Sequence, residues 1–326
     1  MVDGTQPNGS EHRLEVLRRL RAAGLPCRLV VQFDPATGLC VDATASEDAY
    51  TSEQVMVEPM FEQARPHDLF VADRHYAVGR LFLCVHDRRA NFVIREHLPQ
   101  LILHELRRAK RTGRVETGVV WEQPVEVTDG KTERRLKLRR VIVKLDEPTE
   151  KGETEIRLLT NLPVRVNAKK IARLYRRRWS IERHFDLIKN SLHGQVESLG
   201  QPRASIFALC LSMVASNALA VVKGAITTTH GEDETDKLSG YYLADEIAGN
   251  YRAVDALIPQ AEFDRLSVQS AKRFWSWCRS VAKQIRPQAF YAHPRGPKRP
   301  PPKRASGKHR HHYSTHRLLQ EDKQRC

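Results

Sequence analysis

A helix predicted over residues 175–189 most constrains what this chain can fold into. Four chemically different side chains follow one another in it at spacings of three, four and seven residues, namely Tyr175, Arg178, Glu182 and Lys189. Each helical residue turns about 100°, so these spacings predict side chains within about 60° of one another on one face. An apolar stripe beside that face indicates packing against a core; it consists of Leu174, Ile181, Phe185, Ile188 and Leu192.

A carboxylate, a guanidinium, an ammonium and a phenol on one helix face suit a metal-assisted reaction on a phosphate. The acid can hold a cation, while Arg and Lys hold phosphate oxygens. The simpler interpretation is an amphipathic helix with an Arg178–Glu182 pair on a solvated face. Four functional types beside Trp179 favour the functional interpretation. Asn167 is the expected N-cap of the helix.

The order Tyr-x2-Arg-x3-Glu-x6-Lys, with its Arg-Trp-x-Ile-Glu context, resembles the signature of the IS-four family of bacterial insertion-sequence transposases, a branch of the DDE transposases. The resemblance implies a catalytic, metal-binding Glu182. It implies a clamp on a phosphate of the non-transferred DNA strand, formed by Tyr175, Arg178 and Lys189, and makes Trp179 a candidate DNA contact. It also implies two Asp residues beside the Glu, so that three acids hold two Mg2+ ions, for which Mn2+ can substitute.

The run Leu69–Ala72 is apolar and ends at Asp73, which is typical of a buried strand that delivers a carboxylate at its C-terminal edge. The alternative is a strand-end Asp that caps the next helix. The resemblance favours the catalytic role, because the family shows the same Ala-Asp-Arg at its second catalytic Asp. It makes Asp73 a metal ligand and Arg74 a candidate DNA contact.

The first catalytic Asp is expected in an Asp-Gly pair, and Asp3-Gly4 supplies one. Alone, such a pair indicates a turn, and near a terminus it can lie in a frayed tail. The order Asp3, Asp73, Glu182 matches the family and favours a catalytic, metal-binding Asp3. Only Met1 and Val2 precede it, whereas the family fold has a longer central strand and usually an N-terminal DNA-binding region. We therefore expect an N-terminally truncated chain, through a misassigned start codon or as a fragment.

The composition indicates a nucleic-acid partner. The chain has 54 Lys and Arg against 39 Asp and Glu, a formal charge of +15. Such a surface binds the phosphate backbone largely without reading sequence. The charge is concentrated at residues 286–326, which hold 11 Lys and Arg against 2 Asp and Glu in a Pro-rich context, and we expect a disordered tail there.

The pattern of elements predicts an α/β fold with a ribonuclease H-like mixed sheet flanked by helices. Strands are expected at Asp3 and at 28–33, 39–44, 69–73 and 91–95, and helices at 52–64, where Pro59 is a potential kink, and 78–85. Short strands at 115–120, 125–127, 135–143 and 154–159 match the family's β-rich insertion domain before the catalytic helix. Five parts follow: the first part of the core at 1–97, the insertion domain at 98–160, the catalytic helix and the following helix at 161–230, a helical C-terminal region at 231–285 and the tail at 286–326.

In relatives an aromatic residue of the insertion domain holds a flipped base near the transposon end. Trp121 is the candidate for that DNA contact, and a core or surface Trp is the alternative. Residues 204–222 carry no charge over a length close to that of a membrane span. Their Ser, Asn and Ala content favours a buried core helix, so we expect no membrane partner.

The function expected from these observations is that of a DNA transposase. It would cleave phosphodiesters at transposon inverted-repeat ends in a metal-dependent reaction and join them to target DNA. By resemblance we expect a homodimer in the active complex, located in the bacterial cytoplasm on the nucleoid. Two alternatives stay open. One is an inactive DNA-binding remnant, and the other is a ribonuclease H-like nuclease without strand transfer.

Overall fold

The computed structural model describes residues 1–9, 14–20, 23–97, 101–150, 152–196, 198–257, 261, 264, 270–293 and 313–325. The chain forms two compact units. The first comprises residues 1–6, 27–35 and 41–183, and the second comprises residues 7–26, 36–40 and 184–326. Both predicted catalytic Asp residues and Glu182 lie in the first unit, whereas Lys189 lies in the second.

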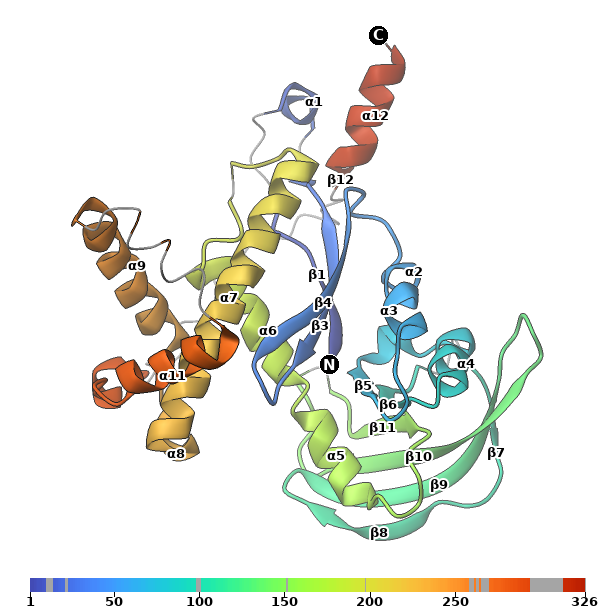
Figure 1. The fold of residues 1–326 in the computed structure, drawn as a ribbon. Coiled ribbons are helices and arrows are strands. Elements are labelled where there is room, and N and C mark those ends of the chain that lie inside the picture. Colours follow the sequence, from blue (N-terminus) through green and yellow to red (C-terminus); the bar gives the residue numbers. More distant parts are fainter. Residues whose placement is uncertain are drawn as a thin grey trace. The chain divides into compact units, whose positions relative to one another are not determined.

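Within the described residues, the strands of the first unit belong to one mixed sheet (Figure 1). Half of it has the order β4-β3-β1-β5-β6, with bounds Leu39–Ser46, Arg28–Asp34, Val2–Thr5, Leu69–Ala72 and Asn91–Arg95. β1 is antiparallel to β3 and parallel to β5, and β5 is parallel to β6. This order confirms the predicted α/β, ribonuclease H-like class. β3, β5 and β6 each hold three consecutive buried apolar residues, as expected of strands covered on both faces; these are Leu29–Val31, Phe70–Ala72 and Phe92–Ile94.

The strands predicted as an insertion extend the same sheet from the β6 edge, with the order β6-β11-β10-β9-β7 and with β8 paired to β9. Their bounds are Glu155–Thr160 for β11, Arg135–Leu145 for β10, Gly118–Thr128 for β9, Ile102–Glu105 for β7 and Lys110–Val115 for β8. The prediction of separate strands at 115–120 and 125–127 is wrong. Continuous antiparallel pairing with β10 makes residues 118–128 a single strand.

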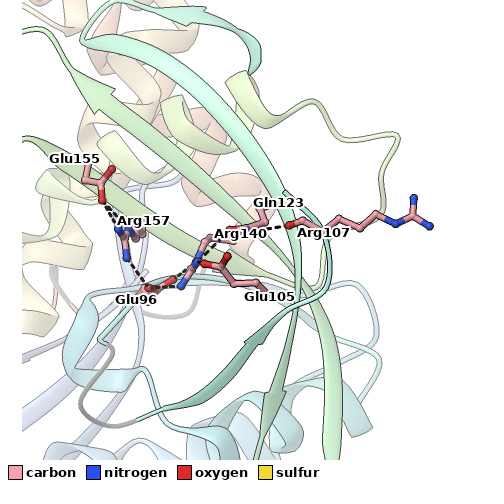
Figure 2. A network of polar contacts seen from close by, with 7 residues as sticks. All are labelled: Glu96, Glu105, Arg107, Gln123, Arg140, Glu155 and Arg157. Atoms are coloured by element: carbon pink, nitrogen blue, oxygen red, sulfur yellow. Dashed lines mark hydrogen bonds and ion pairs between the residues drawn. The ribbon is translucent and has the colours of Figure 1, made fainter. Parts of the chain in front are cut away.

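A buried ion-pair network ties the inserted strands to the rest of the sheet (Figure 2). Arg140 on β10 donates to both carboxylate oxygens of Glu96, which follows β6, at 2.5 and 2.7 Å. The two side chains are only 4% and 2% exposed. Arg140 also donates to Glu105 on β7 at 2.8 Å and to Gln123 on β9 at 3.1 Å. The Arg140 guanidinium therefore connects β10 with β7, with β9 and with the residue that follows β6.

Three short helices, which Figure 1 shows together beside β5 and β6, cover one face of this sheet; they are α2 (Glu53–Met56), α3 (Glu58–Glu62) and α4 (Gly79–Asp87). Phe61 and Phe82 are fully buried in the core between helices and sheet, where Phe82 stacks on Phe92 with ring centroids 4.7 Å apart. The single helix predicted at 52–64 is interrupted at Val57, and Pro59 lies in the first turn of α3, where proline is tolerated.

The helix predicted over residues 175–189 is not continuous. α5 (Ala168–Arg176) begins at Asn167, whose side chain accepts from Lys169 N, so Asn167 is an N-cap as predicted, but the helix that it caps ends before Glu182. A turn at residues 177–178 separates α5 from α6 (Trp179–Asp186), and the π-helix η3 (Leu187–Ser191) follows. Because of this break, the residues from Tyr175 to Lys189 do not follow one continuous helical rotation of about 100° per residue, on which their expected common face depended. α5 packs against β8, β9 and β10 (Figure 1).

The second unit is built around α7 (Pro202–His230). Its other elements include η3, α8 (Glu232–Thr235), α9 (Gly240–Leu257), α11 (Ala271–Ala282) and η4 (Pro287–Phe290). A core of Leu219, Ile226, Leu243 and Cys278 joins α7, α9 and α11. By length and composition alone α7 could cross a membrane, and 39% of its most apolar stretch is buried inside the molecule. It ends at Gly231, whose φ of 90° suits glycine.

Four small elements complete the second unit, namely α1 (Glu15–Arg18), β2 (Gly24–Leu25), β12 (Tyr313–Ser314) and α12 (Thr315–Arg325). β12 pairs in parallel with β2, and α12 contacts α1. For residues 313–325 the structure therefore differs from the predicted disordered tail, because backbone pairing and helix contacts order them. The basic Pro-rich run at 297–304 lies outside the described residues.

Candidate active site

Two adjacent strands bring Asp3 and Asp73 to one place. Asp3 lies on β1, and Asp73 directly follows β5. The two strands are parallel neighbours with Val2 opposite Ala72, so each acid comes one residue after this pair. Both side chains line a cavity of about 410 Å³ in the first unit. The structure therefore brings together two acids that are far apart in the sequence.

The carboxylate of Asp3 is half-buried, and its surroundings strongly shift its pKa. Its Oδ1 accepts from Gly4 N at 2.9 Å, and its Oδ2 accepts from Arg178 at 2.8 Å. Burial raises the pKa of Asp3 to about 7, although Arg178 acts in the opposite direction. The nearby carboxylates of Asp73 and Glu53 raise this pKa further. A titratable group with such a pKa in a cavity is typical of functional sites.

Asp73 also has the capping role that the sequence left open. Its Oδ1 accepts from His75 N at 2.7 Å, which makes Asp73 the N-cap of the 3-10 helix η1 (Arg74–Tyr76). The cap uses one carboxylate oxygen and fixes the orientation of the side chain beside the cavity. Capping and catalysis are therefore compatible at this position.

Glu182 on α6 is linked to Asp3 through Arg178. Arg178 lies in the turn between α5 and α6, and its Nη2 donates to Glu182 Oε1 at 2.7 Å. Its Nη1 donates to Asp3. The guanidinium side chain is 12% exposed, whereas that of Glu182 is 44% exposed. The Arg178 guanidinium therefore lies between Asp3 and Glu182, and Asp3 lines the same cavity as Asp73.

Tyr175 and Trp179 belong to a second, more apolar cavity of about 630 Å³ in the same unit. Tyr175 near the end of α5 is buried, and this burial raises the pKa of its phenol. Trp179 at the start of α6 is 64% exposed. The other wall comes from inserted strands and includes Val143, Leu145, Ile156 and Leu158.

The remaining predicted residues lie in different surroundings. Arg74 lines the acidic cavity and pairs with Glu153 at 3.3 Å. Trp121 lies on β9 with Lys144 Nζ 5.0 Å from its ring centroid, and it is not among the described residues that line either cavity. Lys189 lies in η3 of the second unit, where burial lowers the pKa of its ammonium group.

Sequence reasoning missed Glu53, a further acid in the first cavity. Glu53 lies in the first turn of α2, and its Oε2 accepts from the buried hydroxyl of Tyr76 at 3.1 Å. No local pattern distinguishes it from Glu58 or Glu62 nearby. Glu53 begins α2, seven residues after the last residue of β4, and only the folded structure places it beside Asp3 and Asp73.

The acidic cavity has ligand atoms that fit divalent cations. Its carboxylate oxygens are the hard ligands that Mg2+ and Mn2+ prefer. Burial is the main cause of the raised pKa of Asp3, and the carboxylates of Asp73 and Glu53 add to it, so a bound cation would favour the ionised form of Asp3. In the described part of the chain, no group of three or more acidic, His or Cys side chains already has metal-binding geometry. The residues fit such an ion provided that the Arg178 contacts rearrange.

Comparison with known proteins agrees with this geometry. A family model described as a transposase DDE domain matches residues 21–218, which is more than half of the 326-residue chain. The match includes Asp73 and the whole run from Tyr175 to Lys189, whereas Asp3 precedes it. A search of curated proteins found no match. With a ribonuclease H-like sheet, neighbouring acids on its central strands and this match, the chain belongs to the DDE transposase domain family.

Proposed function

We propose that this chain is a transposase of the IS-four type, which cleaves DNA at transposon ends and joins the ends to target DNA. The proposal rests on one observation: Asp3 and Asp73 line the same cavity, and Arg178 links Asp3 to Glu182. Three acids on these elements are what phosphodiester cleavage of this class requires.

Asp3, Asp73 and Glu182 would hold two Mg2+ ions, for which Mn2+ can substitute. When bound, such ions supply Lewis acidity to both the attacking and the leaving oxygen of an in-line displacement. The protein contributes acids that are positioned before the reaction, so little reorganisation is needed. Strand pairing and the cap at His75 orient Asp73, and the Gly4 amide orients Asp3.

Arg178 is the group that we expect to move. Its guanidinium now contacts two carboxylates, and the same planar donor set suits phosphate oxygens. We propose that DNA binding transfers Arg178 from these acids to a phosphate of the non-transferred strand, with Tyr175 and Lys189 completing the clamp. Arg74, Trp179 and Trp121 are proposed DNA contacts, and the exposure of Trp179 supports its availability for stacking.

The proposed partners are transposon inverted-repeat ends and target DNA, bound by a homodimer on the bacterial nucleoid in the cytoplasm. The formal charge of +15 supports strong, salt-dependent DNA binding. We propose the five-part organisation at 1–97, 98–160, 161–230, 231–285 and 286–326 as a division by role and not into separately folding parts, because the inserted strands belong to the same sheet as the core.

The test uses duplexes that carry the inverted repeats flanking the coding sequence, with Mg2+ or Mn2+. We expect cleavage at the repeat ends, joined products with target DNA and loss of both in Glu182→Gln, while DNA affinity is kept. Glu62→Gln, an exposed acid on α3, is the matched control and should stay active. Cleavage by Glu182→Gln would overturn the assignment.

The same assay separates the two alternatives. DNA binding without nicking in either metal would identify a binding-only remnant. Hydrolysis without preference for the repeat ends and without joined products would identify a ribonuclease H-like nuclease. Either result would replace the transposase activity proposed for this chain.

A further inference from the structure

The cavity that holds Asp3 and Asp73 contains a third carboxylate that the proposed mechanism does not use, that of Glu53. The described lining comprises Asp3, Gly4, Arg28, Glu53, Asp73 and Arg74, together with His75 and His97. Acids and basic groups therefore face one space of about 410 Å³. Such a mixture suits a cation together with a phosphate oxygen.

The Glu53 carboxylate lies against the backbone of Gly4. A Cβ placed on Gly4 would lie 2.2 Å from Glu53 Cδ and 2.4 Å from each carboxylate oxygen, which is closer than atoms can approach. The glycine after Asp3 therefore gives the carboxylate its place beside the catalytic strand. The Asp-Gly pair has a steric reason here, which differs from the turn that its sequence alone indicates.

Tyr76 fixes the direction in which this carboxylate points. Its side chain is fully buried, and its hydroxyl donates to Glu53 Oε2 at 3.1 Å. Burial and the neighbouring acids raise the pKa of Tyr76 well above its usual value, so the phenol remains a donor. A carboxylate held by a buried phenol is preorganised and loses little entropy when it binds a ligand.

The simpler explanation for Glu53 is a structural ion pair with Arg28, and this pair is present, with 3.7 Å between Arg28 Nη1 and Glu53 Oε1. The hydrogen bonds of the guanidinium, however, go to other groups. Arg28 directs its Nη1 to Thr51 O and its Nη2 to Gln6 Oε1, each at 3.2 Å. Within the described residues, the buried Arg28 Nε and His97 Nδ1 have no hydrogen-bond partner. An arginine N–H can only donate, so the unpaired Arg28 Nε suits a phosphate oxygen beside the acids rather than the cation itself.

We propose that Glu53 is a fourth carboxylate of the catalytic centre, which holds the divalent cation together with Asp3 and Asp73, directly or through one water. The inference rests on the proposed function, since it concerns the cation of the same reaction. It adds a ligand from the helix after β4 to the three acids that the resemblance implies.

The test is Mn2+ binding by the full chain without DNA, measured from the electron paramagnetic resonance signal of free Mn2+. We expect Glu53→Gln to weaken Mn2+ binding roughly 10-fold or more, within the range found when supporting residues of metal sites are removed. Glu62→Gln removes the same charge from an exposed position on α3 and should bind as the wild type does. Asp73→Asn reports independently on the proposed site.

Gly4→Ala is the second variant, and it keeps every charge. Its new methyl group requires the Glu53 carboxylate to move away, so its Mn2+ affinity should fall as in Glu53→Gln. Circular dichroism melting in chelator shows that each variant is folded. If Glu53→Gln does not fold, the Gly4→Ala result decides.

The outcomes separate the inference from the proposed function. Weakened binding in Asp73→Asn and Glu53→Gln, with Glu62→Gln unchanged, supports both. Wild-type affinity in Glu53→Gln or in folded Gly4→Ala, combined with weakened binding in Asp73→Asn, overturns the role of Glu53 and leaves the proposed function standing. Wild-type protein that binds no Mn2+ overturns the cation site and the inference with it.

Discussion

Arg178 donates to the carboxylate of Asp3 at 2.8 Å, although the two residues are 175 positions apart in the sequence. The contact joins the turn between α5 and α6 to the central strand of the sheet. Because the same guanidinium donates to Glu182, one positive charge offsets part of the repulsion among the acids. The proposed catalytic centre is thus held together by a residue that we also expect to bind DNA.

Removing the charge of Arg178 should destabilise the protein. Arg178→Met leaves Asp3 half-buried without its cationic partner, and we expect a loss of about 2–3 kcal/mol in the free energy of unfolding at pH 8. Urea unfolding in chelator measures it. Arg183→Met, at an exposed position on α6, is the control and should change stability by less than about 0.5 kcal/mol. Equal effects in the two variants would contradict the structural role of Arg178.

The raised pKa of Asp3 predicts a pH dependence of stability in chelator. The pKa of about 7 lies above the ordinary value of 3.8, so the folded protein binds this proton more tightly than the unfolded chain does. Between about pH 4 and pH 7 the contribution of Asp3 to stability therefore falls as pH rises, by up to about 4 kcal/mol.

Asp3→Asn replaces the carboxyl group with a neutral amide that does not titrate in this range, and it therefore isolates the effect. The stability of the wild type relative to Asp3→Asn should decrease from pH 4.5 to pH 8 and then remain constant. Urea unfolding of both proteins at several pH values measures the difference. A difference that is flat over this range, or that rises with pH, would show that burial does not raise the pKa of Asp3.

Removing one partner of the buried Arg140–Glu96 ion pair should strongly lower the free energy of unfolding. Among the described residues, Arg140→Leu leaves the buried Glu96 with Arg157 at 3.6 Å as its remaining ion-pair contact, and we expect a loss of about 3–5 kcal/mol in the free energy of unfolding. The double variant with Glu96→Leu should recover much of it, because no charge is then stranded. Thermal and urea unfolding measure both.

A surface pair supplies the comparison for that experiment. Arg135 pairs with Glu126 at 3.6 Å and its side chain is 72% exposed. Arg135→Leu should therefore change stability by no more than about 1 kcal/mol. If Arg140→Leu costs as little as Arg135→Leu, the network does not hold the inserted strands to the β6 edge in the way that the geometry indicates.

The N-cap of α5, the helix before the turn that holds Arg178, is expected to contribute measurably to stability. Asn167→Ala removes the acceptor for Lys169 N and should cost about 1 kcal/mol, whereas Asn167→Asp keeps an acceptor and should cost little. Unfolding free energies of the three proteins test this. A loss in Asn167→Asp as large as in Asn167→Ala would point to a contact other than the cap.

Local sequence patterns predicted several elements well. The strand at residues 91–95 has the predicted bounds, and Asn167 caps its helix as expected, because both signals depend on neighbouring residues. The turn at 177–178 and the π-helix at 187–191 were missed. A helical pattern of apolar residues continues through such irregularities, so periodicity alone cannot reveal them.

The sequence by itself determined the class of sheet, the strand that ends at Asp73 and the signature from Tyr175 to Lys189, since alternating and helical patterns and short motifs are local properties. Only the tertiary structure decided that Arg178 lies between Asp3 and Glu182 and that Glu53 shares the cavity with Asp3 and Asp73. These contacts depend on which strands become neighbours and on the steric space left at Gly4. The pairing of distant segments creates both conditions, and no stretch of sequence contains them alone.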